Sequence, residues 1–243
     1  MIHSGSRHWG KFIGDVYVSK FQKLCQAQGI SLEDRMLAYA GIGSRDFDEY
    51  YNIMKAALNF AVANRHRMML VVREAFASVF GSSPADLRMS LLYDIAHNVA
   101  KFEEIDGTRY LVLRKGATRA FPAHHPRLKD GPWYDTGHPV ITPGSMGTSS
   151  HVLVGLEGGK DTFYSINHGS GRRFSRHHAR KTISDDQFLR SMEGILYNVR
   201  NINRIKDEAP DAYKDINDVI DAVETAGLAK VVATLKPQAV VKG

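Results

Sequence analysis

The chain contains one cysteine, Cys25, and no long hydrophobic run in its 243 residues. A single cysteine excludes an internal disulfide framework and any zinc site built from paired cysteines, as is typical of proteins from a reducing compartment. No apolar run approaches the roughly 20 residues that span a bilayer, and the first residues lack the apolar segment of a secretory signal. The sequence also shows no internal repeat and no low-complexity tract. These absences predict a cytoplasmic protein without a membrane partner.

What the chain does contain is an ordinary globular composition with an excess of positive charge. Hydrophobic residues make up 43% and charged residues 24%, which is enough for a core in one large domain or two small ones. The 32 lysine and arginine residues exceed the 26 aspartate and glutamate residues, giving a net charge of +6. This excess favours polyanionic partners such as nucleic acids, although charge alone fits a merely basic protein equally well.

Helical periodicity dominates the first part of the chain. Apolar positions over 9–28 recur at helical spacing and predict a helix. A second apolar stripe predicts a long helix over 46–80 and allows a break near Val71. A proline early in 84–95 predicts a third helix, with His97 and Asn98 at its end.

The middle of the chain is rich in short β-type segments. These lie at 110–113, 151–156 and 162–166, between loops dense in glycine and proline. After residue 180 the pattern becomes helical again. The order of elements predicts a single α+β domain over 1–243, with mixed or antiparallel sheets surrounded by helices.

The segment 168–172 reads His-Gly-Ser-Gly-Arg and carries the strongest chemical signal. A neutral imidazole is a good nucleophile toward phosphorus, and a neighbouring glycine lets the backbone approach a phosphate. Arg172 and Arg176 can hold phosphate oxygens. An isolated histidine usually packs in the core or caps an element, but the glycines and arginines weaken that interpretation. The segment predicts phosphoryl or nucleotidyl transfer on a nucleic acid, with His168 as the nucleophile.

Two further segments carry candidate donors for an anion. Residues 143–147 read Pro-Gly-Ser-Met-Gly, a tight turn whose amides and Ser145 hydroxyl can converge on an anion. Residues 114–120 place three cations around a glycine directly after a predicted strand. Each pattern alone is also typical of an ordinary surface loop, so neither identifies a site without the others.

His3 and His97 are the candidate metal ligands. Each lies beside small or polar residues that could orient the ring. Two histidines without a carboxylate or thiolate do not complete a metal site. The pairs His124–His125 and His177–His178 have poor ligand spacing, and we interpret them as surface residues.

Six segments follow one another in a characteristic order. They are His-Ser-Gly-Ser-Arg at 3–7, His-Asn at 97–98, Arg-Lys-Gly-Ala-Thr-Arg-Ala at 114–120, Pro-Gly-Ser-Met-Gly at 143–147, His-Gly-Ser-Gly-Arg at 168–172 and Asp-Glu-Ala-Pro-Asp-Ala-Tyr-Lys at 207–214. In order and spacing these segments resemble the RtcB family of RNA-splicing ligases. The chain end, Val-Val-Lys-Gly at 240–243, fits the same pattern. The resemblance therefore runs the length of the chain.

This resemblance implies a GTP- and manganese-dependent ligase that joins an RNA 3′-phosphate or 2′,3′-cyclic phosphate end to a 5′-hydroxyl end. His168 would accept GMP from GTP and pass it to the RNA 3′-phosphate, and the 5′-hydroxyl would then displace GMP. Manganese (Mn2+) would offset the charge that keeps an anionic nucleophile from an anionic phosphate. The expected partners are GTP and RNA, either tRNA halves or broken RNA.

The resemblance also implies roles for individual residues. The nucleotide site would comprise His97, Asn98, Pro143, Gly144, Ser145, Met146, Ser150, His168, Gly169, Ser170, Gly171, Tyr213 and Lys242. Tyr213 would pack on the guanine and Lys242 would reach its edge. Manganese would bind His3 and His97, while Arg7, Arg172 and Arg176 would hold RNA phosphates.

The chain departs from the family in one major respect. The upstream part of the family pattern is missing, including the Asp-x-Gly-Cys-Gly and Gly-Asn-His segments that supply further metal ligands. We therefore expect the C-terminal portion of an RtcB-like ligase domain, acting as a fragment or as a split subunit with a separate N-terminal ligase fragment. Apolar surface that the missing part would cover is expected. The alternative is a non-catalytic RNA- or nucleotide-binding protein derived from such a ligase.

Overall fold

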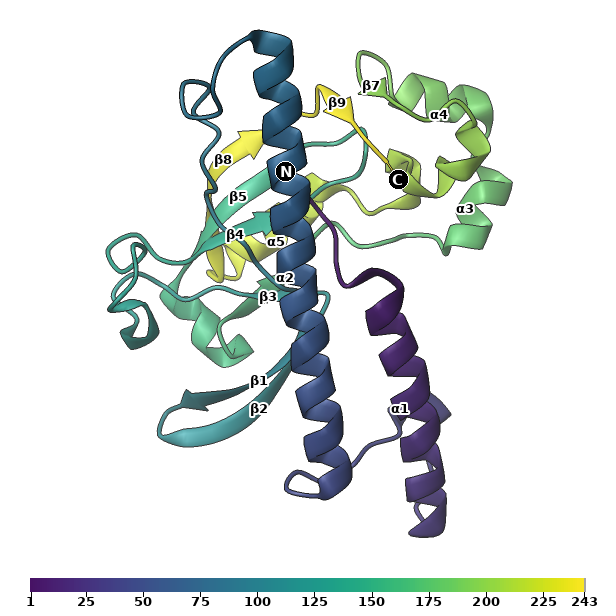
Figure 1. Ribbon diagram of the computed structural model, residues 1–243, viewed down its shortest axis with the longest axis vertical. Coiled ribbons are helices and arrows are strands. Elements are labelled where there is room, and N and C mark those ends of the chain that lie inside the picture. Colours follow the sequence, from purple (N-terminus) through teal and green to yellow (C-terminus); the bar gives the residue numbers. More distant parts are fainter. Residues whose placement is uncertain (243) are drawn as a thin grey trace. The chain divides into compact units, whose positions relative to one another are not determined.

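The computed structural model describes residues 1–242. The chain divides into two compact units, Met1–Asp94 and Ile95–Gly243, whose elements are labelled in Figure 1. The first unit is helical, and the second holds every strand of the described residues. This mixture of helices and small sheets confirms the expected α+β class. The single domain over the whole chain stays a prediction.

Two long helices form most of the first unit. They are α1 (Arg7–Ala27) and α2 (Arg45–Phe80), with the short 3-10 helix η1 (Arg35–Leu37) between them. Helix α2 begins where the Ser44 hydroxyl accepts the backbone N–H of Phe47 at 3.2 Å, an N-cap that satisfies one of the free amides of the first turn. Both helices confirm the predictions made from the spacing of apolar residues. The break allowed near Val71 does not occur.

Aromatic and charged side chains join α1 to α2. The Tyr17 and Phe21 rings of α1 lie 5.1 and 5.6 Å from the Tyr50 ring of α2. Beside them, the Lys20 ammonium lies 2.7 Å from Asp46 and 2.8 Å from Glu49. Aromatic pairs at these distances add to the free energy gained from burial alone.

The helix predicted over 84–95 is wrong. The backbone N–H of Met89 donates to the Pro84 carbonyl at 2.9 Å, which closes a turn. Arg88 has a φ of 52°, a left-handed conformation that ends a right-handed helix. Proline suits the start of a turn as well as the first turn of a helix, so the sequence signal was ambiguous. His97 lies in a bend directly before the strand that begins at Asn98.

The second unit contains four small sheets. Strand β1 (Asn98–Ile105) pairs with β2 (Thr108–Lys115), β3 (Ala117–Arg119) with β6 (Ser165–Asn167), and β5 (Ser150–Gly155) with both β4 (Pro139–Thr142) and β8 (Ala229–Leu235), all antiparallel. Strands β7 (Leu196–Tyr197) and β9 (Ala239–Val240) run parallel. The expectation of mixed or antiparallel sheets is confirmed, because every sheet within residues 95–242 except the β7–β9 pair is antiparallel.

Short helices complete the second unit. They are η2 (Pro126–Leu128), η3 (Glu157–Thr162), α3 (Arg176–Thr182), α4 (Asp185–Ser191), η4 (Ile202–Arg204), η5 (Lys206–Glu208), η6 (Pro210–Ala212) and α5 (Ile216–Thr225). Most of the strand predicted over 162–166 is absent, since η3 occupies its start and β6 begins only at Ser165. The helical pattern predicted after residue 180 is divided among α3, α4, irregular segments and α5.

Two apolar clusters form the core of this unit. The first, between α5 and the β4–β5–β8 sheet, contains Ala120, Val140, Leu153, Ile166, Ile216, Ile220, Val223 and Ala229. The second contains Met146, Ala179, Ile183, Phe188, Met192, Ile205, Ala209 and Ala212. Burial of each large side chain contributes about 1.5–3 kcal/mol. Because Val140 belongs to the first cluster and Met146 to the second, the loop 143–147 is anchored at both ends.

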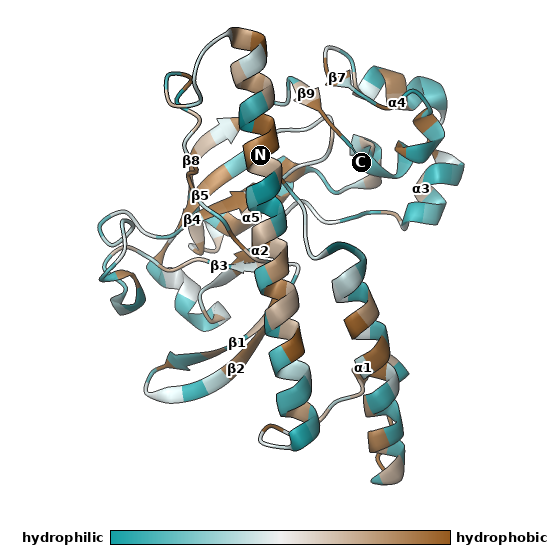
Figure 2. Ribbon diagram, viewed as in Figure 1, coloured by the Kyte–Doolittle hydropathy of each residue, from teal (hydrophilic) through white to brown (hydrophobic). Residues whose placement is uncertain are grey.

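Apolar side chains also remain at the surface. Phe12 in α1, Val79 in α2 and Leu113 in β2 are 66%, 79% and 74% exposed. Figure 2 shows hydrophobic and hydrophilic residues interspersed along α2. The expectation that a missing part of the ligase covers apolar surface stays a prediction. Within residues 1–242, no helix is both long and apolar enough to cross a membrane.

Candidate functional site

His168 lies directly after β6, where the chain leaves the β3–β6 pair. Its backbone N–H donates to the Gly116 carbonyl at 3.2 Å, and the Gly116 N–H donates to the His97 carbonyl at 2.9 Å. The His97 and His168 rings stack with centroids 4.3 Å apart. Asn98 joins this group, since its Oδ1 lies 3.4 Å from the Gly116 nitrogen. The structure thus brings together three of the predicted motifs.

Gly116 allows the close approach of His168. Its φ of 69° lies in the left-handed region that favours glycine. A Cβ at this position would lie 3.3 Å from Nδ1 and 3.4 Å from Cε1 of His168, closer than an ordinary van der Waals contact. The Nδ1 side of the ring therefore faces the Gly116 backbone, and Nε2 is the ring nitrogen farther from it.

The loop at 143–147 contacts the segment that follows His168. The Pro143 carbonyl accepts the backbone N–H of Ser170 at 3.2 Å. A Cβ on Gly169 would lie 3.0 Å from the same carbonyl oxygen, so only glycine fits this contact without a shift. Ser170 is 4% exposed, and among residues 1–242 its hydroxyl has no hydrogen-bond partner. A buried hydroxyl of this kind is suited to a ligand atom.

Inside the loop, side-chain hydroxyl groups accept hydrogen bonds from the backbone N–H groups. The N–H of Ser145 donates to Thr148 Oγ1 at 2.7 Å, and that of Gly144 donates to Ser150 Oγ at 3.3 Å. These amides therefore do not converge on an anion, contrary to the sequence interpretation. The hydroxyls of Ser145 and Thr148 lie 2.9 Å apart, so one donates to the other and the second keeps its proton for a ligand. Met146 is buried in the second apolar cluster and anchors the loop.

A second group of predicted residues surrounds Glu208. Its Oε1 accepts hydrogen bonds from Arg172 and Arg176, each at 2.8 Å. Its Oε2 accepts the Tyr213 hydroxyl at 2.6 Å and lies 3.4 Å from the Lys242 ammonium. One carboxylate therefore contacts four residues to which the sequence assigns nucleotide or RNA binding.

Asp207 extends this group through a fully buried carboxylate. It accepts hydrogen bonds from Arg176 at 2.7 Å and from Arg180 at 3.1 Å, and its side chain is 1% exposed. We call Asp207, Glu208, Tyr213 and the cations Arg172, Arg176, Arg180 and Lys242 the carboxylate cluster. Because its four cations outnumber its two carboxylates, the cluster keeps a positive charge that suits an anionic ligand.

Backbone contacts fix the cluster beside the His168 segment. The Gly171 carbonyl accepts the N–H of Lys214 at 3.0 Å, and the Arg172 guanidinium lies 4.7 Å from the centre of the Tyr213 ring. At the other end, the Lys242 N–H donates to Asn198 Oδ1 at 2.9 Å, and the Asn198 side chain donates to the Lys242 carbonyl at 3.1 Å. The chain end is thereby held near the site.

The charge states of the cluster follow from its contacts. Burial raises the pKa of the Tyr213 hydroxyl, and its hydrogen bond to Glu208 raises the pKa further. Burial opposes ionisation of Glu208, but the Tyr213 hydrogen bond and the nearby cations bring the pKa of this carboxyl below its usual range. The pKa of Asp207 is lowered because two arginine hydrogen bonds outweigh its burial. Both carboxylates are charged at neutral pH.

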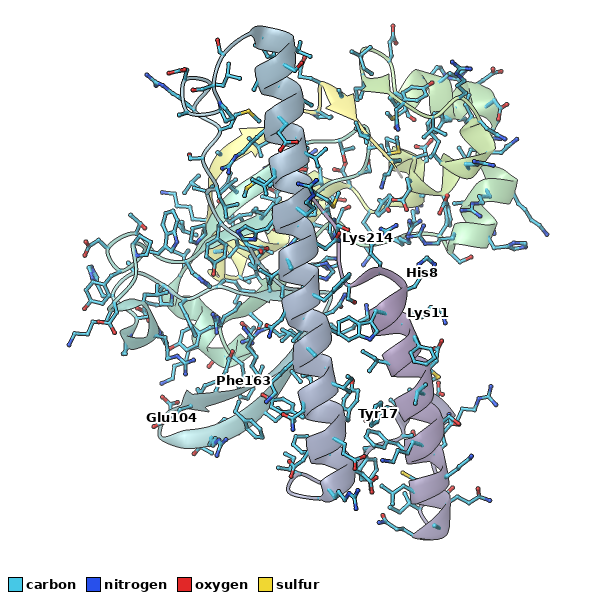
Figure 3. All side chains as sticks on the ribbon, in the orientation of Figure 1. His8, Lys11, Tyr17, Glu104, Phe163 and Lys214 are labelled. Atoms are coloured by element: carbon cyan, nitrogen blue, oxygen red, sulfur yellow. The ribbon has the colours of Figure 1, made fainter. Side chains whose placement is uncertain are left out.

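A large open hollow adjoins the His168 segment. Its volume is about 980 Å³, and β6 and α5 line it. Asn167, the residue before His168, is part of the lining, as are Lys214 and Asp218; Lys214 is labelled in Figure 3. The lining is mainly apolar with a few charged groups, as in many small-molecule sites.

The described residues do not form a complete metal site. Within 1–242, no three histidine, cysteine, aspartate or glutamate side chains are grouped so that they could hold a metal ion. Manganese therefore does not fit the side chains of this chain by themselves. His97 lies in the second unit and His3 in the first, and their joint role as ligands stays a prediction.

Arg7 and His3 lie on the segment that leads into α1. The Ser4 carbonyl accepts a hydrogen bond from Arg65 at 3.1 Å, and Arg65 pairs with Asp94 at 2.6 Å. The segment is thus held against α2 within the first unit. The predicted contact of Arg7 with RNA phosphate remains a prediction.

Asp207 and Glu208 are absent from the residues that the sequence assigned to the site. The sequence does carry a signal for them, because the segment 207–214 begins with this acidic pair in a chain that is strongly basic overall. Their partners Arg172 and Arg176 lie more than 30 positions upstream. No local spacing rule connects groups that far apart.

An α+β unit that holds a histidine among glycine- and hydroxyl-rich loops, beside a basic cluster, has the chemistry of a site for phosphorylated ligands. Comparison with known proteins agrees with this class. A family model described as tRNA-splicing ligase RtcB matches residues 1–243, so the chain belongs to the RtcB family.

The chain is also similar to the tRNA-splicing ligase RtcB of Thermococcus kodakarensis. The two sequences are 41% identical over 250 residues, which cover 100% of this chain and 52% of that relative. The resemblance inferred from the six motifs is thereby confirmed. The chain spans about half the length of the curated relative that it matches.

Proposed function

We propose that the chain is the C-terminal portion of a GTP- and manganese-dependent RNA ligase. Such a ligase joins RNA 3′-phosphate or 2′,3′-cyclic phosphate ends to 5′-hydroxyl ends through a histidine-GMP intermediate. The observation that carries the proposal is the position of His168. It stacks on His97, rests against Gly116, and leads into a segment bonded to the Pro143 loop.

His168 is the nucleophile of the first step. Its Nδ1 side lies against Gly116, which favours Nε2 as the attacking nitrogen, with the ring proton on Nδ1. The bond from Nε2 to the α-phosphorus of GTP forms while the bond from that phosphorus to its bridging oxygen breaks, and pyrophosphate leaves with the electron pair. The ring then carries a positive charge, which makes it a good leaving group.

The remaining two steps move the guanylate and then release it. A 2′,3′-cyclic phosphate end would first be hydrolysed, water forming a bond to phosphorus while the bond to the 2′-oxygen breaks. An oxygen of the RNA 3′-phosphate then attacks the phosphorus on His168, and the electron pair of the broken N–P bond returns the ring to its neutral form. The 5′-hydroxyl oxygen then attacks the activated 3′-phosphorus, its proton passes to solvent, and GMP leaves. Arg172 and Arg176 would hold the phosphates during these exchanges. Both guanidinium groups also contact Glu208.

Tyr213 and Lys242 supply the contacts to the base. The Arg172 guanidinium covers one face of the Tyr213 ring, so the guanine would pack on the opposite face. Lys242, held near Glu208, would reach the edge of the base. The buried Ser170 hydroxyl and the Ser145 and Thr148 hydroxyls would meet the phosphate or ribose.

The metal would need further ligands from the part of such a ligase that this chain does not match. The described side chains do not group into a manganese site, while the matched relative is about twice as long as the aligned segment. We infer that an N-terminal ligase part completes the site, either within the same protein or as a separate N-terminal ligase fragment if this chain is a fragment or split subunit. Membership of a family of tRNA-splicing ligases favours tRNA halves as the RNA substrate.

A reconstitution experiment tests this proposal. The chain is combined with the part of the Thermococcus relative that the chain does not match, and is incubated with GTP, manganese and two RNA pieces ending in a 3′-phosphate and a 5′-hydroxyl. We expect joined RNA from the mixture, little from the chain alone, and none when His168→Ala replaces the wild-type chain.

A second candidate function is favoured by the lack of a metal-binding group of side chains among residues 1–242. In this case the chain binds RNA or nucleotide without joining ends. RNA retention by the mixture with no joined product, unchanged in His168→Ala, would support the binding protein and reject the ligase.

A further inference from the structure

Glu208 connects the two parts of the proposed nucleotide site. Its Oε2 faces the Tyr213 hydroxyl and the Lys242 ammonium, and its Oε1 accepts from Arg172 and Arg176. These partners come from α3 and its approach, from the segment before α5, and from the chain end. The carboxylate itself does not need to touch a ligand in order to determine where these groups lie.

We propose that Glu208 is a positioning residue that holds Tyr213 and Lys242 in the arrangement that selects guanine. This inference rests on the proposed function, in which these two side chains contact the base. Selection of guanine over adenine requires polar groups at fixed places along the edge of the base, since the two purines differ only there.

The position of Lys242 shows why one carboxylate matters. The backbone of Lys242 is fixed by its two hydrogen bonds with Asn198, but the side chain beyond that point is long and 39% exposed. A lysine side chain loses considerable conformational freedom when its ammonium is held in one place. The Glu208 carboxylate supplies an attraction that offsets this loss.

Tyr213 is held by the same atom. Its hydroxyl donates to Glu208 Oε2 and accepts from Arg172, at 2.6 and 2.8 Å, so the ring cannot rotate without breaking one of two charge-assisted hydrogen bonds. The lowered pKa of Glu208 keeps the carboxylate ionised at neutral pH. A neutral amide in its place would keep the size of the side chain but remove the charge that holds both partners.

The experiment compares Glu208→Gln with a matched control. Asp211→Asn removes a carboxylate three residues away that is exposed, so it changes the net charge equally without touching the cluster. Both variants and the wild-type chain, each full length, are titrated with GMP and with AMP by calorimetry. Tyrosine labelled at Cζ is followed by NMR in the same proteins, with Tyr213→Phe identifying its resonance.

We expect Glu208→Gln to lose the preference for GMP over AMP. Glu208→Gln should weaken GMP binding about tenfold, the cost of a lost hydrogen bond to a charged group, while AMP binding changes less. The Tyr213 resonance should shift in Glu208→Gln and stay unchanged in Asp211→Asn. General unfolding would instead reduce binding of both nucleotides together.

Two different failures are distinguishable. If the wild-type chain prefers GMP and Glu208→Gln keeps the same preference, the positioning role is wrong and the proposed function stands. If the wild-type chain binds neither nucleotide, or binds both equally, the guanine contacts assigned in the proposed function are wrong, and the positioning role is overturned with them.

Discussion

The His168 loops and the carboxylate cluster are built in different ways. Around His168, the contacts are mainly backbone hydrogen bonds to Gly116 and Pro143, with glycine wherever a Cβ would collide. In the carboxylate cluster, side chains from distant segments meet at Asp207 and Glu208. The first region should therefore be sensitive to added atoms, and the second to changes in charge and pH.

Substitution of Gly116 should have the largest effect. In Gly116→Ala, the new Cβ would lie 3.3 Å from His168 Nδ1, so the ring must move by some tenths of an ångström. We expect guanylate transfer in the completed ligase to fall by about tenfold, since reacting groups tolerate little misplacement. Radiolabelled GTP measures the transfer.

Gly107→Ala is the matched control for this change. Gly107 has a similar φ of 73° but open space around its Cβ position, so both variants carry the backbone strain, about 1–2 kcal/mol, and only one disturbs His168. Equal losses of labelling in the two variants would show that His168 does not depend on a tight contact with Gly116.

A buried histidine outside both regions should give the largest effect on stability. Burial, the positive charge of Arg119 and other nearby cations lower the pKa of His138 to about 4, although its Nδ1 lies 3.2 Å from the Arg119 carbonyl. The unfolded chain therefore takes up a proton first on acidification. Stability is full above the ordinary histidine pKa and is lost as the pH falls toward 4.

This loss should reach about 2 kcal/mol at pH 5. Urea unfolding of the wild type and of His138→Asn, at pH 7.5 and pH 5, measures it. We expect the fall in unfolding free energy between these pH values to be smaller in the variant. Identical falls would mean that the acid sensitivity in this range comes from elsewhere.

Asp207 tests the charge sensitivity of the cluster at lower pH. Asp207→Asn should destabilise the chain by about 1 kcal/mol near neutral pH, a modest amount because Arg176 and Arg180 remain more than half exposed. The folded pKa of Asp207 lies below its unfolded value. Its contribution is therefore present above the unfolded pKa and is lost as the pH falls through the folded one.

Urea unfolding of the wild type and of Asp207→Asn, near pH 7 and near pH 3, measures this contribution. The difference between wild type and Asp207→Asn should shrink at the lower pH. A difference that stays constant would indicate that the variant acts through packing rather than through charge.

Ser170 should have the smallest effect on stability. Its buried hydroxyl has no hydrogen-bond partner within residues 1–242, so Ser170→Ala should change the free energy of unfolding by less than about 0.5 kcal/mol. GMP binding should nevertheless weaken. The control Ser175→Ala removes the N-cap of α3, where the hydroxyl accepts from His178 at 3.2 Å, and should cost about 1 kcal/mol.

Equal stability losses in Ser170→Ala and Ser175→Ala would contradict a free hydroxyl at position 170. Unchanged GMP affinity in Ser170→Ala would remove this hydroxyl from the proposed nucleotide site. The two measurements are independent, so each can fail without the other.

The spacing of apolar residues was sufficient to predict the long helices. It was insufficient where a segment can form a turn instead of a helix. Helices α1, α2 and α5 follow from apolar spacing because each must bury one face. The segment 84–95 was predicted to be helical from its early proline, but it closes into a turn in which Arg88 is left-handed. Strands β2 and β5 were predicted, whereas β8 was not.

The candidate site also has a part that the sequence predicted and a part that it did not. The motifs around His97, Gly116, Pro143 and His168 were visible in the sequence because glycine and histidine are distinctive locally, and the structure brings them together. The carboxylate cluster was not predicted. Its ion pairs depend on side chains that meet only after the chain has folded.

The most direct test locates the guanylate on the chain. The mixture of this chain with the unmatched part of the relative is incubated with GTP and manganese without RNA, digested under mildly alkaline conditions that preserve N–P bonds, and sequenced by tandem mass spectrometry. We predict one guanylate on His168 Nε2 in the wild-type chain and about tenfold less of it in Gly116→Ala at comparable times. A guanylate on His97, on Lys242 or on the other polypeptide would contradict the assignment of His168 as the nucleophile.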